Sequence, residues 1–249
     1  ACTLSFSYAY SAEKIMVPEQ LMNKKVCIVD SAFIGPHDSI LLENAEKMHL
    51  NSMENALANL RSGKTDAIIY DTNVLNYIAA RNPDLMVLPE KYFEKNMVFA
   101  INSSKTNLKS LVDSKIDEMT ANGQLENMRN YWFSERGMTS PMPEIIITPK
   151  TEGGNNLIYG TCGMNEPFAF IGNDTKVIGY EIELAMYVAQ TMEAQFFVET
   201  MPPLELMPSV EQGKVDMAGG FMEGSPMLKN VISSKPYFKS SVSIMVLKK

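Results

Sequence analysis

Asp71 is the residue whose position in this sequence most directly suggests chemistry. It follows the apolar run Ala67-Ile68-Ile69-Tyr70, which lacks polar alternation and predicts a strand covered on both faces of an α/β sheet. A carboxylate at the end of such a strand is costly to bury unless it is paired with a cation or accepts hydrogen bonds. Asp71 therefore has two candidate roles: it receives a cationic group of a ligand, or it caps a helix that begins at Thr72.

Two patterns that could suggest an enzyme are incomplete. Gly63-Lys64-Thr65 looks like the end of a phosphate-binding loop, but Ala58 stands where that motif needs its first glycine, and the order of strand and helix is reversed. The cysteines Cys2, Cys27 and Cys162 form no Cys-x-x-Cys pair and no metal-ligand spacing, and both histidines are isolated. The sequence therefore predicts no catalytic residues, no cofactor and no metal site.

The elements that position Asp71 occur twice in the chain. Residues 54–71 read ENALANLRSGKTDAIIYD, and residues 204–222 read LELMPSVEQGKVDMAGGFM. Each is an amphipathic helix, then Gly-Lys-Xaa-Asp, then an apolar strand. Gly63 and Gly213 stand where a helix end favours a left-handed residue, and the lysine that follows each places a cation at the negative end of the helix dipole. Two copies of one helix-strand unit indicate two similar α/β halves.

The rest of the chain also alternates between strands and helices. Periodicity predicts further strands over residues 24–30, 85–88, 97–101, 156–161 and 195–199. It predicts helices over residues 37–47, 72–81 and 181–192, and two more between 108 and 133 that are separated at Asn122-Gly123. Residues 164–170 are expected to form a loop, and residues 137–156 a linker rich in Pro and Gly with a short strand at 145–147.

The composition is that of a globular protein. The chain has 249 residues, 45% of them hydrophobic and 20% charged, which is enough material for one large domain or for two lobes, with a core. A net charge of −7 and the lack of a basic cluster argue against a nucleic-acid partner. No apolar run approaches the ~18 residues that a membrane-spanning helix needs.

The first and last segments of the chain resemble each other. When residues 4–17 are laid on residues 233–246 without gaps, Tyr8 matches Tyr237 and both segments end in Ile-Met-Val. The same type of strand is therefore expected near both ends of the chain.

A series of short motifs carries a resemblance to a known family. Residues 156–246 resemble the N-terminal lobe of the extracellular solute-binding proteins of polar amino-acid transporters, and residues 18–133 resemble their second lobe and closing helices. The motifs of the first stretch are YGT at 159–161, PFAF at 167–170, GYEIELA at 179–185, QGKVD at 212–216 and SKPYF at 234–238. Those of the second are KKV at 24–26, GKTDA at 63–67, Asp71, GQL at 123–125 and YWF at 131–133. The resemblance implies an α/β, type II periplasmic-binding-protein fold, a two-lobed clamp in which each lobe is a sheet flanked by helices.

The order of these parts differs from the order in the family, whose chain runs from first lobe to hinge, second lobe and closing helices. We expect residues 1–17 to form a hinge strand, 18–100 the second lobe, 101–135 closing helices packed on the first lobe, 136–155 a linker, 156–238 the first lobe and 239–249 a duplicate hinge strand. The chain is either a circular permutant, the interpretation we favour, or a piece cut from a tandem pair. If residues 8–17 enter the second lobe, the strand at 240–247 is left over, and pairing with a second copy would turn a monomer into a strand-swapped dimer.

The resemblance also implies where the ligand binds, namely between the lobes at the carboxyl ends of strands. It implies that Asp71 accepts the α-amino group of the ligand. The arginine that holds an α-carboxylate in the family corresponds to Met227, so a bidentate carboxylate anchor is missing. The other expected ligand-binding residues are Ser31, Phe33, Asn165, Phe168, Phe221 and Glu223, with Glu166 adding negative charge at the same rim, although each phenylalanine equally fits a core position.

These substitutions predict a ligand that is an amine or an amino-acid-like compound. The chain is then the solute-binding protein of an ABC-type transporter, with a membrane permease as partner, in the periplasm or outside the cell and anchored by lipid if Cys2 is modified. A degenerate clamp that senses or scaffolds in a signalling receptor is the alternative. A dehydratase-like enzyme on the same fold is a third interpretation, against which Met227 counts, because that substrate also needs a cationic anchor for its carboxylate.

Overall fold

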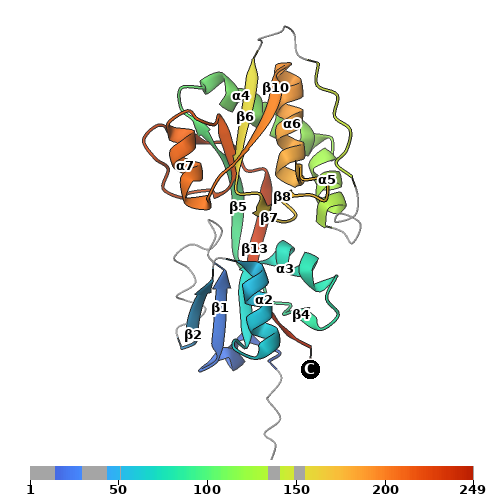
Figure 1. Cartoon of the computed structure of the whole chain (residues 1–249), viewed down its shortest axis with the longest axis vertical. Coiled ribbons are helices and arrows are strands. Elements are labelled where there is room, and N and C mark those ends of the chain that lie inside the picture. The colour runs from blue at the N-terminus through green and yellow to red at the C-terminus, as the bar shows by residue number, and fades with distance from the viewer. Residues whose placement is uncertain (1–14, 30–43, 51, 134–140, 149–154, 249) are drawn as a thin grey trace, which may run out of the picture.

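The computed structural model describes residues 15–29, 44–50, 52–133, 141–148 and 155–248, which form two α/β lobes joined end to end (Figure 1). We name the lobes lower and upper after their places in Figure 1. The lower lobe contains η1 (Pro18–Leu21), β1 (Lys25–Val29), β2 (Glu46–Leu50), α2 (Met53–Ser62), β3 (Ala67–Asp71), α3 (Thr72–Ala79) and β4 (Leu85–Val87). The upper lobe contains α4 (Thr106–Ala121), α5 (Gln124–Phe133), β6 (Asn156–Thr161), β7 (Met164–Asn165), β8 (Ala169–Ile171), β9 (Val177–Ile178), α6 (Tyr180–Met192), β10 (Gln195–Thr200), α7 (Pro203–Glu211), β11 (Met217–Met222) and β12 (Val231–Ser233).

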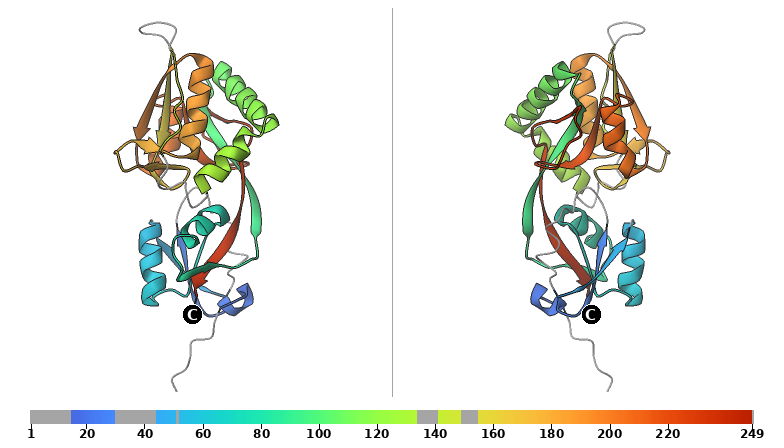
Figure 2. Two further views of the ribbon diagram at one scale, coloured as in Figure 1. Left: turned by 90° about the vertical axis from the view of Figure 1, so that its right-hand side faces the viewer. Right: turned by 90° about the vertical axis from the view of Figure 1, so that its left-hand side faces the viewer.

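Two long strands belong to both lobes. β5 (Tyr92–Asn102) and β13 (Phe238–Leu247) pair with each other in antiparallel fashion and run from one lobe into the other (Figure 2). Within the described residues the chain passes between the lobes only along these two strands. They are therefore the hinge of the molecule.

Both lobes have the same strand order. In the upper lobe it is β10-β6-β11-β5 with β12 also paired to β5, and in the lower lobe it is β2-β1-β3-β13 with β4 also paired to β13. Three parallel strands in each lobe are followed by a crossing strand that runs antiparallel to them. The predicted α/β class with two similar halves is therefore confirmed. Because the two lobes share one topology, either can be matched to either lobe of a relative, and the permuted order stays a prediction.

The duplicated Gly-Lys-Xaa-Asp unit joins α2 to β3 in the lower lobe and α7 to β11 in the upper lobe. Gly63 and Gly213 have φ values of 74° and 71°, the left-handed conformation that the sequence predicts at these helix ends. The carboxylate of Asp66 accepts a hydrogen bond from a backbone N–H of β1 (2.9 Å), and that of Asp216 accepts one from β6 (2.8 Å). The aspartate of each unit thus fastens it to the first strand of its own lobe.

Each sheet is covered on both faces, which accounts for its continuous apolar strands. In the upper lobe, α4, α5 and α6 lie on one face and α7 on the other. In the lower lobe, α2 covers the face of Cys27 and Ile68, while on the other face Val26 and Ile69 pack in a cluster with Leu21 of η1 and Leu88. Of the helices that the structure describes, none has the length and apolar character needed to cross a membrane.

Three local predictions are wrong. The helix expected over residues 37–47 does not extend to its predicted end, since Glu46 begins the edge strand β2. The exposed positions of β2 carry polar residues, which obscure the strand pattern in the sequence. Residues 37–43 lie outside the described part. Residues 145–147 form no strand. The loop expected over 164–170 contains β7 and the start of β8, which pair with each other.

The strand near the C-terminus is fully used within the chain. β13 pairs with β3 and β4 in the lower lobe and with β5, so residues 240–247 are not left over. Of the matching N-terminal segment 4–17, residues 4–14 lie outside the described residues, and residues 15–17 are not in a strand.

Candidate functional site

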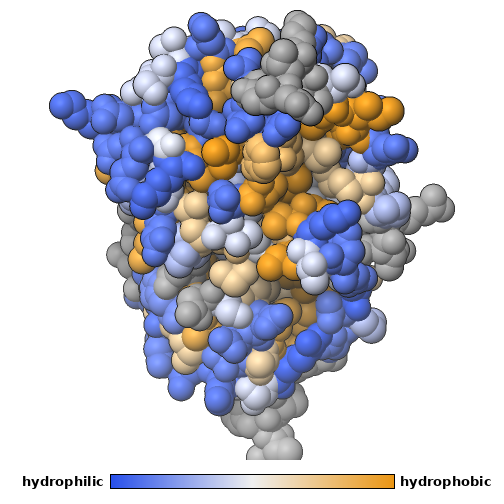
Figure 3. Space-filling view, turned by 45° about the horizontal axis from the view of Figure 1, so that its top comes forward, coloured by the Kyte–Doolittle hydropathy of each residue, from blue (hydrophilic) through white to orange (hydrophobic). Residues whose placement is uncertain are grey.

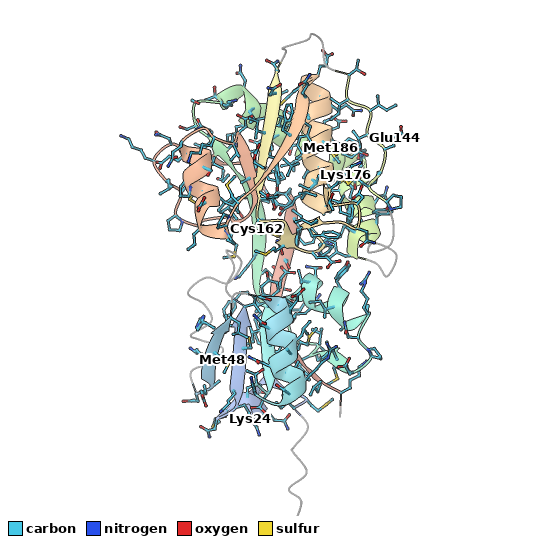
Figure 4. All side chains as sticks on the ribbon, viewed as in Figure 1. Lys24, Met48, Glu144, Cys162, Lys176 and Met186 are labelled. Carbon is cyan, nitrogen blue, oxygen red and sulfur yellow. The ribbon has the colours of Figure 1, made fainter. Side chains whose placement is uncertain are left out.

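The carboxyl ends of the parallel strands of both lobes point toward each other. β1 of the lower lobe and β6 of the upper lobe run toward the middle of the molecule (Figure 1). Cys162, which directly follows β6, lies at the end of the upper lobe that faces the lower lobe (Figure 4). Open α/β sheets bind ligands just outside the carboxyl ends of their strands. The candidate site is therefore the interlobe junction, formed by α3 after β3 and by residues 162–168 after β6.

Asp71 lies at this junction and caps α3. Its Oδ1 accepts hydrogen bonds from the backbone N–H groups of Asn73 (2.9 Å) and Val74 (3.1 Å). The residue is 5% exposed, and burial raises the pKa of its carboxyl above the usual value, an effect that hydrogen bonds from Ser240, Val74 and Asn73 oppose. No cationic side chain among the described residues forms an ion pair with it. The capping role is thus observed, and a buried carboxylate without a cationic partner among the described residues remains at the site.

The start of α3 is also fastened to the hinge by a cluster of hydroxyl groups that sequence reasoning missed. Thr72 Oγ1 lies 2.8 Å from the hydroxyl oxygens of both Ser241 and Ser243 on β13. The side-chain amide of Asn73 donates to Ser240 Oγ (2.7 Å). The only signal in the sequence is the run Ser-Ser-Val-Ser inside an otherwise apolar strand. This hydroxyl cluster ties the position of α3 to that of β13.

The expected site residues of the upper lobe do not form one group. Phe168 is fully buried in an aromatic cluster with Phe133, Tyr180 and Phe238. Phe221 is buried in the apolar layer under α7, and the half-buried Met227 packs against that layer. Both phenylalanines therefore hold core positions in this arrangement of the lobes.

The remaining expected residues have polar neighbours or lie elsewhere. Asn165 is half-buried in β7, where it pairs with β8. Glu223 accepts a hydrogen bond from the side chain of Asn96 on β5 (2.7 Å). Ser31 and Phe33 lie outside the described residues. Their roles in ligand binding stay predictions.

A side-chain hydrogen bond crosses the junction. The phenol of Tyr77 on α3 donates to Glu166 Oε1 of the upper lobe at 2.6 Å. Burial and this carboxylate raise the pKa of Tyr77, so its hydroxyl stays a donor. The two residues are 89 positions apart in the chain, and no local pattern relates them.

A buried acid in the upper lobe is a further group that sequence reasoning missed. Glu181 accepts hydrogen bonds from the phenols of Tyr159 (2.9 Å) and Tyr237. Burial raises the pKa of Glu181 to about 7, although both bonds oppose the shift. Gly219 makes room for this group, because a Cβ there would lie 2.2 Å from the Tyr159 hydroxyl oxygen. In the sequence, Glu181 is indistinguishable from an ordinary acidic residue in the first turn of a helix.

No metal site is found in the described part of the chain, where no three His, Cys, Asp or Glu side chains are grouped to hold an ion.

On the surface, apolar side chains gather over the part of the molecule turned to the viewer in Figure 3 and are bordered by hydrophilic ones. The large apolar residues of the upper lobe that are exposed are Ile146, Met164, Ile171, Phe197, Leu204 and Leu228.

Comparisons with known proteins point to solute-binding and receptor domains. Residues 157–249 match the model of the bacterial extracellular solute-binding proteins, family 3. A stretch of 125 residues is 23% identical to the putative ABC transporter arginine-binding protein 2 of Escherichia coli (strain K12), covering 47% of this chain and 50% of that protein. A stretch of 154 residues is 23% identical to the human ionotropic glutamate receptor NMDA 2C, covering 51% of this chain and 12% of the receptor. The matches thus span half or less of each relative.

A solved structure matches nearly the whole chain. The GluR0 ligand-binding core in complex with L-glutamate is similar with a TM-score of 0.51 at 11% sequence identity, over 92% of this chain and 86% of that one. At this identity the likeness concerns the fold.

Proposed function

Since the chain has the type II periplasmic-binding-protein fold, we propose that it is the extracytoplasmic solute-binding protein of an ABC-type transporter. It captures a small amine or amino-acid-like ligand at the interlobe junction and delivers it to a membrane permease. The match of residues 157–249 to a family of extracellular solute-binding proteins supports this class, and it also supports a binding role over an enzymatic one.

The observation that carries the ligand class is Asp71. A carboxylate that is almost fully buried is stabilised by hydrogen bonds or by an opposite charge. The hydrogen bonds are supplied by the helix cap. No ion pair with Asp71 occurs among the described residues. The ammonium group of a ligand would supply the opposite charge. By the resemblance, Met227 stands where the family has an arginine. Without that guanidinium, a carboxylate of the ligand would contribute less to binding than its ammonium group.

A ligand-sensing domain of a signalling receptor is the second candidate. It is favoured by the similarity to a human ionotropic glutamate receptor and to the GluR0 ligand-binding core. Both candidates use the same junction and the same ligand chemistry, and they differ in what the closed lobes contact. A permease gene beside this gene favours the transporter, and a kinase or channel segment in the same gene favours the sensor.

The test is a thermal-shift screen of the purified chain against amino acids, diamines, polyamines and monoamines. A ligand at a hundred times its Kd stabilises by ~2.7 kcal/mol, a rise in Tm of roughly 5–11 °C for a chain of this size, at 2–4 °C per kcal/mol. Asp71→Asn is the matched variant, because asparagine caps helices as well as aspartate does but carries no charge. We expect the shift to disappear in Asp71→Asn while the variant's own Tm changes little. An amine that stabilises both proteins equally, or a screen with no hit, would contradict the proposed site.

A further inference from the structure

The contact between Tyr77 and Glu166 has the properties of a strong hydrogen bond. The phenol-to-carboxylate distance is 2.6 Å, the acceptor is a carboxylate, and Tyr77 is only 3% exposed. The guanidinium of Arg81 lies 3.7 Å from the centroid of the Tyr77 ring, and it also donates to the backbone oxygen of Tyr77 (2.7 Å). The ring is therefore held in place before the bond to Glu166 forms.

Each partner is fixed within its own lobe. On the lower side, α3 is held by the Asp71 cap and by the hydroxyl cluster on β13. On the upper side, the backbone oxygens of Pro167 and Phe168 accept hydrogen bonds from the first N–H groups of α6 (3.1 and 2.9 Å). Little side-chain or loop entropy is lost when two such preorganised groups meet, so more of the bond's free energy remains.

Both anchors lead to the same hinge strand. Phe168, two residues after Glu166, packs its ring against Phe238 at the upper end of β13, with centroids 4.9 Å apart. Ser241 and Ser243, farther along β13, hold the start of α3. Bending of β13 would therefore change the separation of Tyr77 from Glu166, so that the bond would form in one arrangement of the lobes and break in another.

We propose that Tyr77 and Glu166 form an interlobe latch that stabilises the arrangement of the two lobes in this structure, which we call the closed arrangement. The latch joins protein groups only, so it acts whether or not a ligand is bound. Removal of a hydrogen bond to a charged group should shift the ratio of open to closed molecules by about tenfold to a hundredfold. The latch itself does not depend on the proposed function.

The direct test measures the distance between the lobes in solution. Spin labels at Glu54→Cys on α2 and Glu205→Cys on α7, both exposed positions, report this distance by pulsed electron resonance in a Cys2→Ser, Cys162→Ser background. We expect one short-distance population in the parent, and a longer-distance population in Tyr77→Phe and in Glu166→Ala. The double variant should shift no further than the single ones, because both remove one interaction.

Tyr180→Phe is the matched control. It also removes a buried phenol hydroxyl, but that hydroxyl donates to the backbone oxygen of Tyr237 within the upper lobe (3.1 Å). It should leave the distance distribution of the parent unchanged. Unchanged distances in both latch variants, or an equal shift in Tyr180→Phe, would overturn the latch.

A consequence for ligand affinity rests on the proposed function. If an amine binds the closed lobes, Tyr77→Phe should raise its apparent Kd by the same factor by which the closed population falls. The distance measurement needs no ligand, so a chain that binds no amine would contradict the proposed function and leave the test of the latch intact. An amine whose Kd is the same in the parent and in Tyr77→Phe would contradict the coupling.

Discussion

The two lobes share one strand order and one helix-strand unit but differ in the chemistry of their interiors. In the upper lobe two glutamates of α6 are buried: Glu181 accepts from two tyrosines, and Glu183 accepts from the indole of Trp132 (2.6 Å). In the lower lobe the buried side chains between the strands and the hinge are apolar or carry hydroxyl groups, and the buried carboxylate, Asp71, lies at the rim. A common topology therefore leaves each lobe free to place its charges differently.

A physical reason for the difference is the extra cover on the upper lobe. α4 and α5 pack against α6, and this second layer brings the indole of Trp132 to Glu183. The tyrosine donors of Glu181 come from β6 and from the segment before β13. The lower lobe has α2 and α3 on the corresponding face, without a second layer of helices of the same lobe in the described residues. Its carboxylate is satisfied instead by the N–H groups of a helix start, which are available only at the junction.

The largest loss of stability is expected from a substitution in β11, at a position where β11 has a glycine and the equivalent strand of the lower lobe, β3, has a large side chain. Gly219 occupies in β11 the place that Ile69 occupies in β3, counted from the shared Gly-Lys-Xaa-Asp unit. In Gly219→Ala the new Cβ would lie 2.2 Å from the Tyr159 hydroxyl and 2.4 Å from Glu181 Oε2. The Tyr159 bond must break and the carboxylate loses a donor, so we expect a loss of ~4 kcal/mol in unfolding free energy from overpacking and the broken bond together, measured by urea denaturation.

Gly160→Ala is the control for that substitution. Its Cβ would meet a methyl group of Val215 at 3.0 Å, a side chain that can shift. We expect a loss of ~1 kcal/mol or less, because no hydrogen bond is broken. Equal losses in the two variants would mean that the buried acid does not distinguish the upper lobe energetically.

A somewhat smaller effect is expected in the pH dependence of stability. Burial raises the pKa of Glu181 from 4.5 to about 7 in the folded protein. The folded state therefore binds a proton between these values that the unfolded state has released, and this contribution is complete below about pH 4.5 and lost as the pH rises through about 7. The loss amounts to roughly 3 kcal/mol, at ~1.4 kcal/mol per pKa unit.

The pH effect is isolated by comparing the parent with Glu181→Gln. The difference between their unfolding free energies should change across pH 4.5–7.5, in the direction that the parent loses stability relative to the variant as the pH rises. A difference that is constant with pH would show that the folded and unfolded states ionise Glu181 alike, and the contrast between the lobes would then lie in packing alone.

The smallest effect concerns the hydroxyl cluster of the lower lobe. Thr72→Val keeps the shape of the side chain but leaves the hydroxyls of Ser241 and Ser243 without their common partner, so we expect a loss of ~2 kcal/mol. Thr65→Val is the matched control, since the buried Thr65 hydroxyl has no hydrogen-bond partner in the described structure. That variant should be neutral or slightly more stable. If thermal melting finds both variants equally destabilised, the hydroxyl cluster does not hold α3 to the hinge.

Much of the fold could be predicted because its signals are local. The left-handed glycines 63 and 213, the apolar run before Asp71 and the helix start at Thr72 each depend on residues within one or two turns of chain. The edge strand β2 was missed because its exposed half is polar. The candidate site was predicted less completely: Asp71 was found at the junction, whereas Phe168 and Phe221 have core positions in this arrangement.

The sequence by itself determined the two α/β halves, the repeated unit and a carboxylate at the end of a buried strand, since backbone conformation and apolar periodicity are encoded by neighbours in the chain. Only the tertiary structure decided which groups meet that carboxylate and its helix. The Tyr77–Glu166 bond joins residues 89 positions apart, and the Thr72–Ser241 contact joins residues 169 apart. The physical reason is that such contacts depend on how strands pair and how two lobes dock, which no local pattern specifies.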